Sequence, residues 1–334
     1  MAQSLKFVKR LGLFKNGKTG ILSGMKIIVT HKASDLDAVA SSWIIKRFLP
    51  GWENAEVRFV PAGEKLAGKY LRTGDVIERV AFGDGEEADV IHVDTGMCSL
   101  DHHQIDDDDV CATSLAFDYA LKNNESLKKD ENKVEALKRI VEYAVDDDHF
   151  QELFYQNPTA DIYDFSIVGL LHGIKMLYPK DDVSVMNFGM DALDASLHYF
   201  ENRVWAEHEI AEKGIRFDTK WGKSLAIETL NDTVMKLGQT MGYVLTIRKD
   251  PSTGSVRIKA RPERRPGKKY PEGVFKDVDI DLTPVYEKLK KMDSDATWYL
   301  HVSKRMLLNG SSKNPNMKGS SLTLSEVVEV LQNI

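Results

Sequence analysis

The sequence is poor in cysteine, with Cys98 and Cys111 as its two thiols among 334 residues. Two thiols cannot build a disulfide scaffold, and their spacing is not the CxxC pair of a zinc ribbon. The sequence also lacks any apolar run near the ~20 residues that a membrane-spanning helix requires. These absences exclude a disulfide-rich secreted protein and an integral membrane protein, so we expect a cytoplasmic protein without membrane partners.

Acidic residues are absent from positions 1–24, which contain five basic residues. This stretch lacks the long apolar core and the small-residue cleavage site of a secretory signal, whereas its basic character leaves organellar targeting open. We interpret 1–24 as a basic N-terminal extension, with Met25 as a second candidate start. The remaining length suits two domains.

The first half of the chain alternates short apolar runs with stretches of helical periodicity. The predicted strands cover 26–30, 56–60 and 88–93, and the predicted helices cover 35–48, 112–122, 130–145 and 163–177. Strands that alternate with helices favour an α/β fold with a largely parallel sheet. Ligands of such sheets lie beyond the carboxyl ends of the strands.

The second half has a different pattern, in which strands dominate. The predicted strands cover 214–219, 224–229, 243–248, 256–260 and 297–303, with a hairpin turn over 250–254. A final helix begins near Leu324, where Thr323 and Glu326 have the spacing of a capping box. We therefore expect an α/β domain over 25–190, a connecting helix over 191–213 and a smaller α+β domain over 214–334.

Histidine and aspartate residues gather at the predicted ends of the elements in the first domain. They are His31, Asp35 and Asp37 after the first strand, Asp94 after the third, the run Asp101-His102-His103-Gln104, and the run Asp146-Asp147-Asp148. Imidazole and carboxylate ligands together suit Mn²⁺, Fe²⁺ or Mg²⁺. A carboxylate shared by two such ions would hold them ~4 Å apart, a spacing used in phosphoryl chemistry. One such cluster is commonly a capped loop, but four in this order favour metal binding.

This order of motifs resembles the DHH phosphoesterase superfamily over residues 26–150. The resemblance implies a DHH-type parallel-sheet domain that binds two divalent ions and hydrolyses phosphoesters. It implies that His31 and Asp35 bind one ion, that Asp37, His102 and Asp146 bind the other, and that Asp94 bridges them.

The same resemblance implies roles for the two remaining residues of the Asp-His-His run. Asp101 would orient the neighbouring imidazole, and His103 would face the scissile phosphate and assist the leaving oxygen. Three consecutive aspartates compete for the last ligand position. Asp146 is chosen because Phe150 follows four residues later, where several family members have an aromatic residue.

Within the superfamily, the short spacing from Asp94 to His102 resembles the melanocyte-proliferating-gene family. Gln104, the run 112–117 and the run 299–303 are similar to that family as well. Its members are metal-dependent hydrolases, with RNA exonuclease activity reported for the family. The expected substrate is therefore a nucleic-acid end or a nucleotide.

Residues near the carboxyl end of the second domain are candidates for gripping a terminal phosphate or ribose, with an ordinary strand-to-loop turn as the alternative. They are His301, Lys304, Arg305, Asn309, Ser311 and Lys313. Arg261, Arg264 and Arg265 are candidates for following a nucleic-acid backbone. Because prolines and a glycine interrupt that stretch, a solvated loop is the competing interpretation.

We thus expect a metal-dependent phosphodiesterase, an exonuclease on short single-stranded RNA or DNA, in which two metal ions activate a water molecule. The expected cofactors are two Mn²⁺ ions, with Mg²⁺ as the alternative. One alternative function is an inorganic pyrophosphatase or small-nucleotide phosphatase of the same fold. Another is a non-catalytic metal- or nucleotide-binding protein. The sequence leaves open RNA against DNA, the polarity of degradation and the oligomeric state, for which a homodimer is one option.

Overall fold

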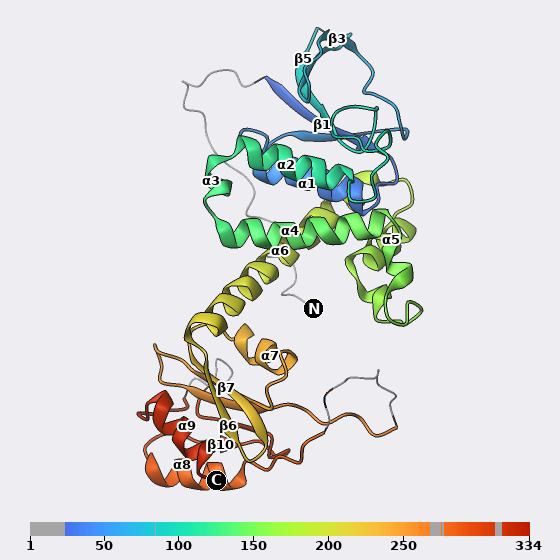
Figure 1. The fold of residues 1–334 in the computed structure, drawn as a ribbon. Coiled ribbons are helices and arrows are strands. Elements are labelled where there is room, and N and C mark those ends of the chain that lie inside the picture. Colours follow the sequence, from blue (N-terminus) through green and yellow to red (C-terminus); the bar gives the residue numbers. More distant parts are fainter. Residues whose placement is uncertain (1–23, 84, 268–274, 276, 311–315) are drawn as a thin grey trace, which may run out of the picture. The chain divides into compact units, whose positions relative to one another are not determined.

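The computed structural model describes residues 24–83, 85–267, 275, 277–310 and 316–334 (Figure 1). The chain divides into two compact units. Unit 1 comprises the residues up to Asn124 together with Ala144–Met190, and unit 2 comprises Glu125–Tyr143 together with Asp191–Ile334. Residues 125–143, which the sequence-based boundaries assign to the first domain, belong to unit 2.

Unit 1 contains a mixed sheet of five strands in the order β2-β1-β5-β4-β3. The strands are β1 (Met25–His31), β2 (Glu56–Val60), β3 (Lys69–Arg72), β4 (Glu78–Ala81) and β5 (Glu87–His92). β1 is parallel to both β2 and β5, whereas β4 is antiparallel to β5 and β3 is antiparallel to β4. The predicted parallel sheet is therefore correct for three strands and wrong for the sheet as a whole.

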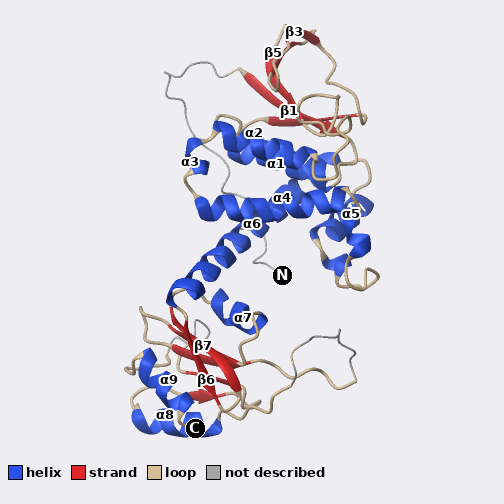
Figure 2. Cartoon of the chain, in the orientation of Figure 1, coloured by secondary structure: helices blue, strands red, loops and turns tan. Residues whose placement is uncertain are grey.

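Helices α1 and α2 cover one face of this sheet (Figure 2). The helices with residues in unit 1 are α1 (Leu36–Phe48), α2 (Ala112–Asn123), the end of α4 (Glu131–Asp148), α5 (Ile167–Leu177) and the start of α6 (Asp182–Lys213). Most of α1 is buried because it contacts both β1 and α2. The observed bounds of α1 and α2 agree with the predicted helices to within one residue.

Unit 2 contains a six-stranded mixed sheet in the order β10-β11-β9-β8-β7-β6. The strands are β6 (Ile215–Thr219), β7 (Gly222–Glu228), β8 (Leu245–Lys249), β9 (Val256–Ala260), β10 (Tyr299–Leu300) and β11 (Met306–Leu308). Besides the rest of α4 and α6, its helices are α3 (Glu125–Lys128), α7 (Thr233–Thr240), α8 (Thr283–Met292) and α9 (Leu324–Gln332). The predicted β8–β9 hairpin is confirmed, and so is the capping box of α9, in which Thr323 and Glu326 exchange hydrogen bonds.

The predicted strand over 297–303 is wrong beyond Leu300. The chain turns at His301–Lys304, where the Lys304 N–H donates to the His301 carbonyl at 2.8 Å and Lys304 has a φ of 57°. β11 then runs antiparallel to β10 and β9. His301 and Ser303 therefore lie in a turn and not on one face of a strand.

Both units are therefore α/β in character, each with a mixed sheet and its own buried core. Within the described ranges, no helix combines the length and apolarity needed to cross a membrane. Cys98 and Cys111 are both free thiols.

Candidate metal centre

The first part of the centre is built where β1 meets α1. His31 is the last residue of β1, and Asp35 is the N-cap of α1, whose side chain accepts from the Ala38 N–H. His31 Nε2 lies 3.6 Å from Asp35 Oδ2. The four-residue spacing thus brings an imidazole and a carboxylate to the same turn of the chain.

Asp94 joins this pair from the neighbouring strand. It follows β5, which is parallel to β1, so that the carboxyl ends of the two strands meet. Asp94 has a φ of 52°, its N–H donates to the Leu100 carbonyl, and only 3% of its surface is exposed. Its Oδ2 lies 3.0 Å from His31 Nε2. Because its backbone is in the left-handed region and is held by this hydrogen bond, Asp94 directs its buried carboxylate toward β1.

The second part of the centre surrounds His102. Its Nε2 lies 3.6 Å from Asp37 Oδ2, 3.6 Å from Asp94 Oδ1 and 3.5 Å from Asp148 Oδ2. These distances exceed those of good hydrogen bonds, although three carboxylate oxygens surround one nitrogen. A cation bound between these nitrogen and oxygen donors suits the arrangement better than direct hydrogen bonds from His102 to the carboxylates. Asp94 thus directs one oxygen to His31 and the other to His102.

The aspartate beside His102 is Asp148 and not Asp146, the residue chosen from the sequence. α4 extends to Asp148, so the three consecutive aspartates point in directions that differ by about 100° each. His149 follows at the end of α4, and its ring centroid lies 6.2 Å from that of His102. Asp148 belongs to the run of three aspartates seen in the sequence, but the sequence-based prediction assigned a ligand role to neither Asp148 nor His149.

Asp37 is held by the start of α2. Its two carboxylate oxygens accept from the N–H groups of Ala112 and Thr113, at 2.8 and 2.7 Å. The free N–H groups and the dipole at a helix N-terminus stabilise such a negative charge. This explains how a carboxylate that is almost fully buried can face His102.

Asp101 contacts His103 and not His102, the other imidazole beside it. Its buried carboxylate lies 2.7 Å from His103 Nδ1 and accepts from the Met97 N–H at 2.7 Å. The hydrogen bond to Asp101 raises the pKa of His103. Because 59% of the His103 side chain is exposed, this imidazole is oriented from the protein side and open to solvent.

The centre has more carboxylates than nearby cations, and the pKa values reflect this. Burial raises the pKa of Asp94, and the neighbouring Asp37 and Asp35 raise it further. Burial raises the pKa of Asp147 to about 6, with contributions from Glu152 and Asp35. Burial lowers the pKa of His31, but hydrogen bonds to Asp35 and Asp94 outweigh it and raise the value. The protein therefore favours extra positive charge here, either as protons or as metal ions.

A different group of potential ligands comes from β4, β5 and the loop after β5, and it does not fit a metal ion. It consists of Glu78, His92 and Cys98. His92 Nε2 accepts from the Leu66 N–H, so the proton of a neutral ring is on Nδ1, which faces Glu78 at 3.0 Å. Lys65 pairs with the same carboxylate at 3.1 Å. His92 is therefore a buried core histidine whose two ring nitrogens have partners within the protein.

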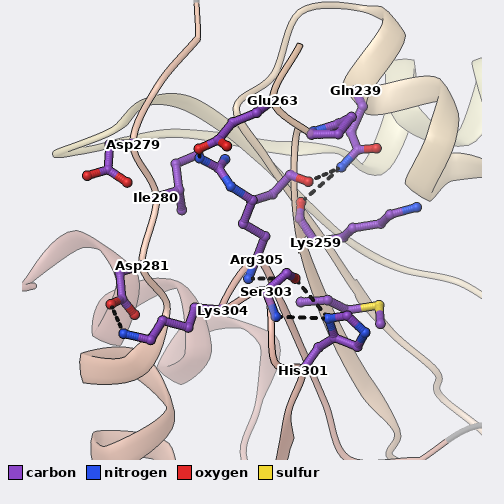
Figure 3. Close-up of a pocket in the computed structure, with 13 residues that line it drawn as sticks. Gln239, Lys259, Glu263, Asp279, Ile280, Asp281, His301, Ser303, Lys304 and Arg305 are labelled. Carbon is purple, nitrogen blue, oxygen red and sulfur yellow. Dashed lines mark hydrogen bonds and ion pairs between the residues drawn. The ribbon is translucent and has the colours of Figure 1, made fainter. Parts of the chain in front are cut away.

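Three of the candidate substrate residues of unit 2, His301, Lys304 and Arg305, line a pocket of about 750 Å³ (Figure 3). His301 Nδ1 lies 2.8 Å from Ser303 Oγ and accepts from the Ser303 N–H. Lys304 Nζ pairs with Asp281 at 2.9 Å. The Arg305 guanidinium donates to the Val278 and Arg261 carbonyls and pairs with Glu263. The cationic groups of Lys304 and Arg305 are therefore both engaged by other groups of the protein.

The remaining candidates of unit 2 are not brought into this pocket. Asn309 is fully buried and accepts from the Val256 N–H, and Ser311 and Lys313 lie outside the described residues. In the proline-containing stretch, Arg264 pairs with Asp277 and Arg261 stacks on Phe275. These two arginines therefore have partners within unit 2.

No protein-family model matches the chain, and a search of curated proteins finds no similar sequence. The resemblance described above therefore depends on the motifs themselves.

Proposed function

We propose that the chain is a divalent-metal-dependent phosphodiesterase that acts on the ends of short single-stranded RNA or DNA. The observation that carries this proposal is the position of Asp94 between two imidazoles. Its oxygens lie 3.0 Å from His31 Nε2 and 3.6 Å from His102 Nε2. A carboxylate shared in this way is the usual bridge of a two-metal site.

Each side of Asp94 has its own set of further donors. His31 and Asp35 would hold one ion, and Asp37, His102 and Asp148 would hold the other. When bound, two divalent ions such as Mn²⁺ or Mg²⁺ lower the pKa of a water molecule and neutralise phosphoryl oxygens. The protein fixes these donors on strand ends and on helix termini, so little reorganisation is needed on binding.

His103 is the candidate for proton transfer. It is exposed at the edge of the centre, and its Nδ1 lies 2.7 Å from Asp101 and 3.7 Å from Asp94 Oδ1. Nδ1–H donates to the Asp101 carboxylate, which favours the protonated imidazolium, and in that form Nε2 carries a second proton that can be donated to a leaving oxygen. Asp101 is thus a positioning residue for His103.

A short substrate end is favoured over a long nucleic acid because three arginines that the structure describes in unit 2 are engaged in ion pairs. Arg257 pairs with Asp232, Arg264 with Asp277, and Arg305 with Glu263. A backbone-tracking surface needs cations that are free to contact successive phosphates. The His301 turn and its pocket offer room for one terminal nucleotide.

The test is hydrolysis of an end-labelled single-stranded RNA ladder, a matching DNA ladder and inorganic pyrophosphate, each with Mn²⁺ or Mg²⁺. We expect stepwise shortening of a ladder that requires the metal and is absent in Asp94→Asn. Release of phosphate from pyrophosphate with intact ladders would favour a pyrophosphatase. Full activity of Asp94→Asn, or no hydrolysis of any substrate by a metal-loaded protein, would contradict the proposal.

A further inference from the structure

Lys175 in α5 approaches the candidate metal centre from an element that carries none of its ligands. Its ammonium donates to the Ala33 carbonyl at 3.4 Å, in the loop between His31 and Asp35. This is its one hydrogen bond within the described part of the chain, so the ammonium keeps donors for another partner. The residue is half-buried.

Lys175 lies beside the proposed ligands through this contact. The Ala33 carbonyl that accepts from its ammonium is two residues after His31 and two residues before Asp35. Lys175 is not itself a ligand, because an ammonium has no lone pair.

A phosphodiester at this centre needs positive charge beyond that of the metal ions. The four carboxylates proposed as ligands carry as much negative charge as two divalent ions carry positive charge. They are Asp35, Asp37, Asp94 and Asp148. An anionic substrate then meets no net attraction from the metals and their ligands alone. His103, held by Asp101, lies on the His102 side, and Lys175 offers an ammonium on the Asp35 side.

We propose that Lys175 binds a non-bridging oxygen of the substrate phosphate on the Asp35 side of the centre. This inference rests on the proposed function. A charge-assisted hydrogen bond from an ammonium to a phosphate oxygen is among the stronger polar contacts in proteins. Lys175 would both attract the substrate and set its orientation relative to the ligands on α1.

A purely structural role is the competing explanation, and Asp182 allows it to be separated. Two hydrogen bonds hold the backbone of Ala33. Its N–H donates to Asp182 Oδ1 at 2.8 Å, and its carbonyl accepts from Lys175. Ala33 has a φ of 55°, so this loop depends on such support. If Lys175 only supports the loop, removing either contact should have similar consequences.

The experiment measures Mn²⁺ affinity and inorganic phosphate affinity of the Mn²⁺-loaded full chain by calorimetry. The variants are Lys175→Met, Lys175→Arg, Asp182→Ala and, as a control at a nearby exposed lysine, Lys180→Met. We expect Lys175→Met to weaken phosphate binding by about 10- to 100-fold. Its Mn²⁺ affinity should be equal or higher, because a positive charge near Asp35 is removed.

Further results would sharpen this assignment. Lys175→Arg should restore much of the phosphate affinity, and Asp182→Ala and Lys180→Met should bind phosphate as the wild type does. Equal losses of Mn²⁺ affinity in Lys175→Met and Asp182→Ala, with unchanged phosphate affinity, would overturn the inference. Absence of phosphate binding by the Mn²⁺-loaded wild type would also overturn it. If phosphate binding depends on Lys175 but no phosphodiester is hydrolysed, the assignment of Lys175 stands and the proposed function fails.

Discussion

The candidate sites of the two units balance their charged side chains differently. In unit 2, two of the three acidic residues that line the pocket have cation partners, in the pairs Asp281–Lys304 and Glu263–Arg305. In unit 1, several buried or half-buried carboxylates share a few imidazoles, and no Lys or Arg of the described chain forms an ion pair with Asp37, Asp94 or Asp148. Balanced charge holds a fold together, whereas unbalanced buried charge needs an external cation.

The largest effect on Mn²⁺ affinity is expected from Asp94→Asn. Loss of an outer partner of a metal ligand commonly costs about 10- to 100-fold in affinity, so loss of a shared ligand should exceed about 100-fold for Mn²⁺. The measurement is calorimetric titration of the metal-free chain. Asp277→Asn, which breaks an exposed pair of unit 2, is the control and should bind Mn²⁺ as the wild type does. An unchanged Mn²⁺ affinity of Asp94→Asn would mean that the clustered carboxylates do not form a metal site.

The next test compares Asp148→Asn with Asp146→Asn. Asp148 lies 3.5 Å from His102 Nε2, and we expect its amide variant to lose about 10- to 100-fold in Mn²⁺ affinity. Asp146→Asn is the matched control, since it removes the same charge two residues away. Metal-induced protection against thermal unfolding should follow the same order, because a ligand stabilises only the state that binds it. A larger loss of Mn²⁺ affinity in Asp146→Asn than in Asp148→Asn would mean that Asp146 is the ligand.

This pair also illustrates what the sequence could establish about the site. The strand-end positions of His31 and Asp94 could be predicted, because parallel strands bring their carboxyl ends together. The choice among three consecutive aspartates could not, since it depends on where α4 ends and how that helix is rotated. Lys175 gave no signal in the sequence, because its contact with the Ala33 carbonyl arises from the tertiary packing of α5.

The fold was predictable to a similar extent. Apolar runs identified β1 and β5, and α1 follows the expected periodicity up to Phe48. The strands β3 and β4 were missed because they are short and rich in charged residues, without an apolar run. In unit 2, the turn at His301–Lys304 was missed because its left-handed residue is a lysine and not a glycine.

A smaller effect is expected from pH, because His31 must lose a proton before a metal ion can bind its nitrogen. Its pKa is raised in the metal-free protein, since hydrogen bonds to Asp35 and Asp94 outweigh burial. The protonated form therefore stabilises metal-free unit 1 below the ordinary pKa of histidine, and this contribution disappears as pH rises through the raised value. Mn²⁺ competes with that proton, so its affinity should increase by up to about 10-fold per pH unit between pH 6 and 8. Titrations in buffers of different ionisation enthalpy would count the protons released, and a pH-independent affinity would contradict the assignment of His31.

The smallest effect should come from the balanced charges of unit 2, where Arg305 and Lys304 are neighbours with different burial. Only 14% of the Arg305 side chain is exposed, and its guanidinium satisfies the Val278 and Arg261 carbonyls. Arg305→Met should lower the free energy of unfolding of unit 2 by about 1–2 kcal/mol, because those carbonyls lose their donor. Lys304→Met should change it little, since its pair with Asp281 is exposed. Differential scanning calorimetry with and without Mn²⁺ separates the units, and neither variant should alter the metal-dependent shift. A loss of Mn²⁺ affinity in either variant would show that these cations do more than balance charge within unit 2.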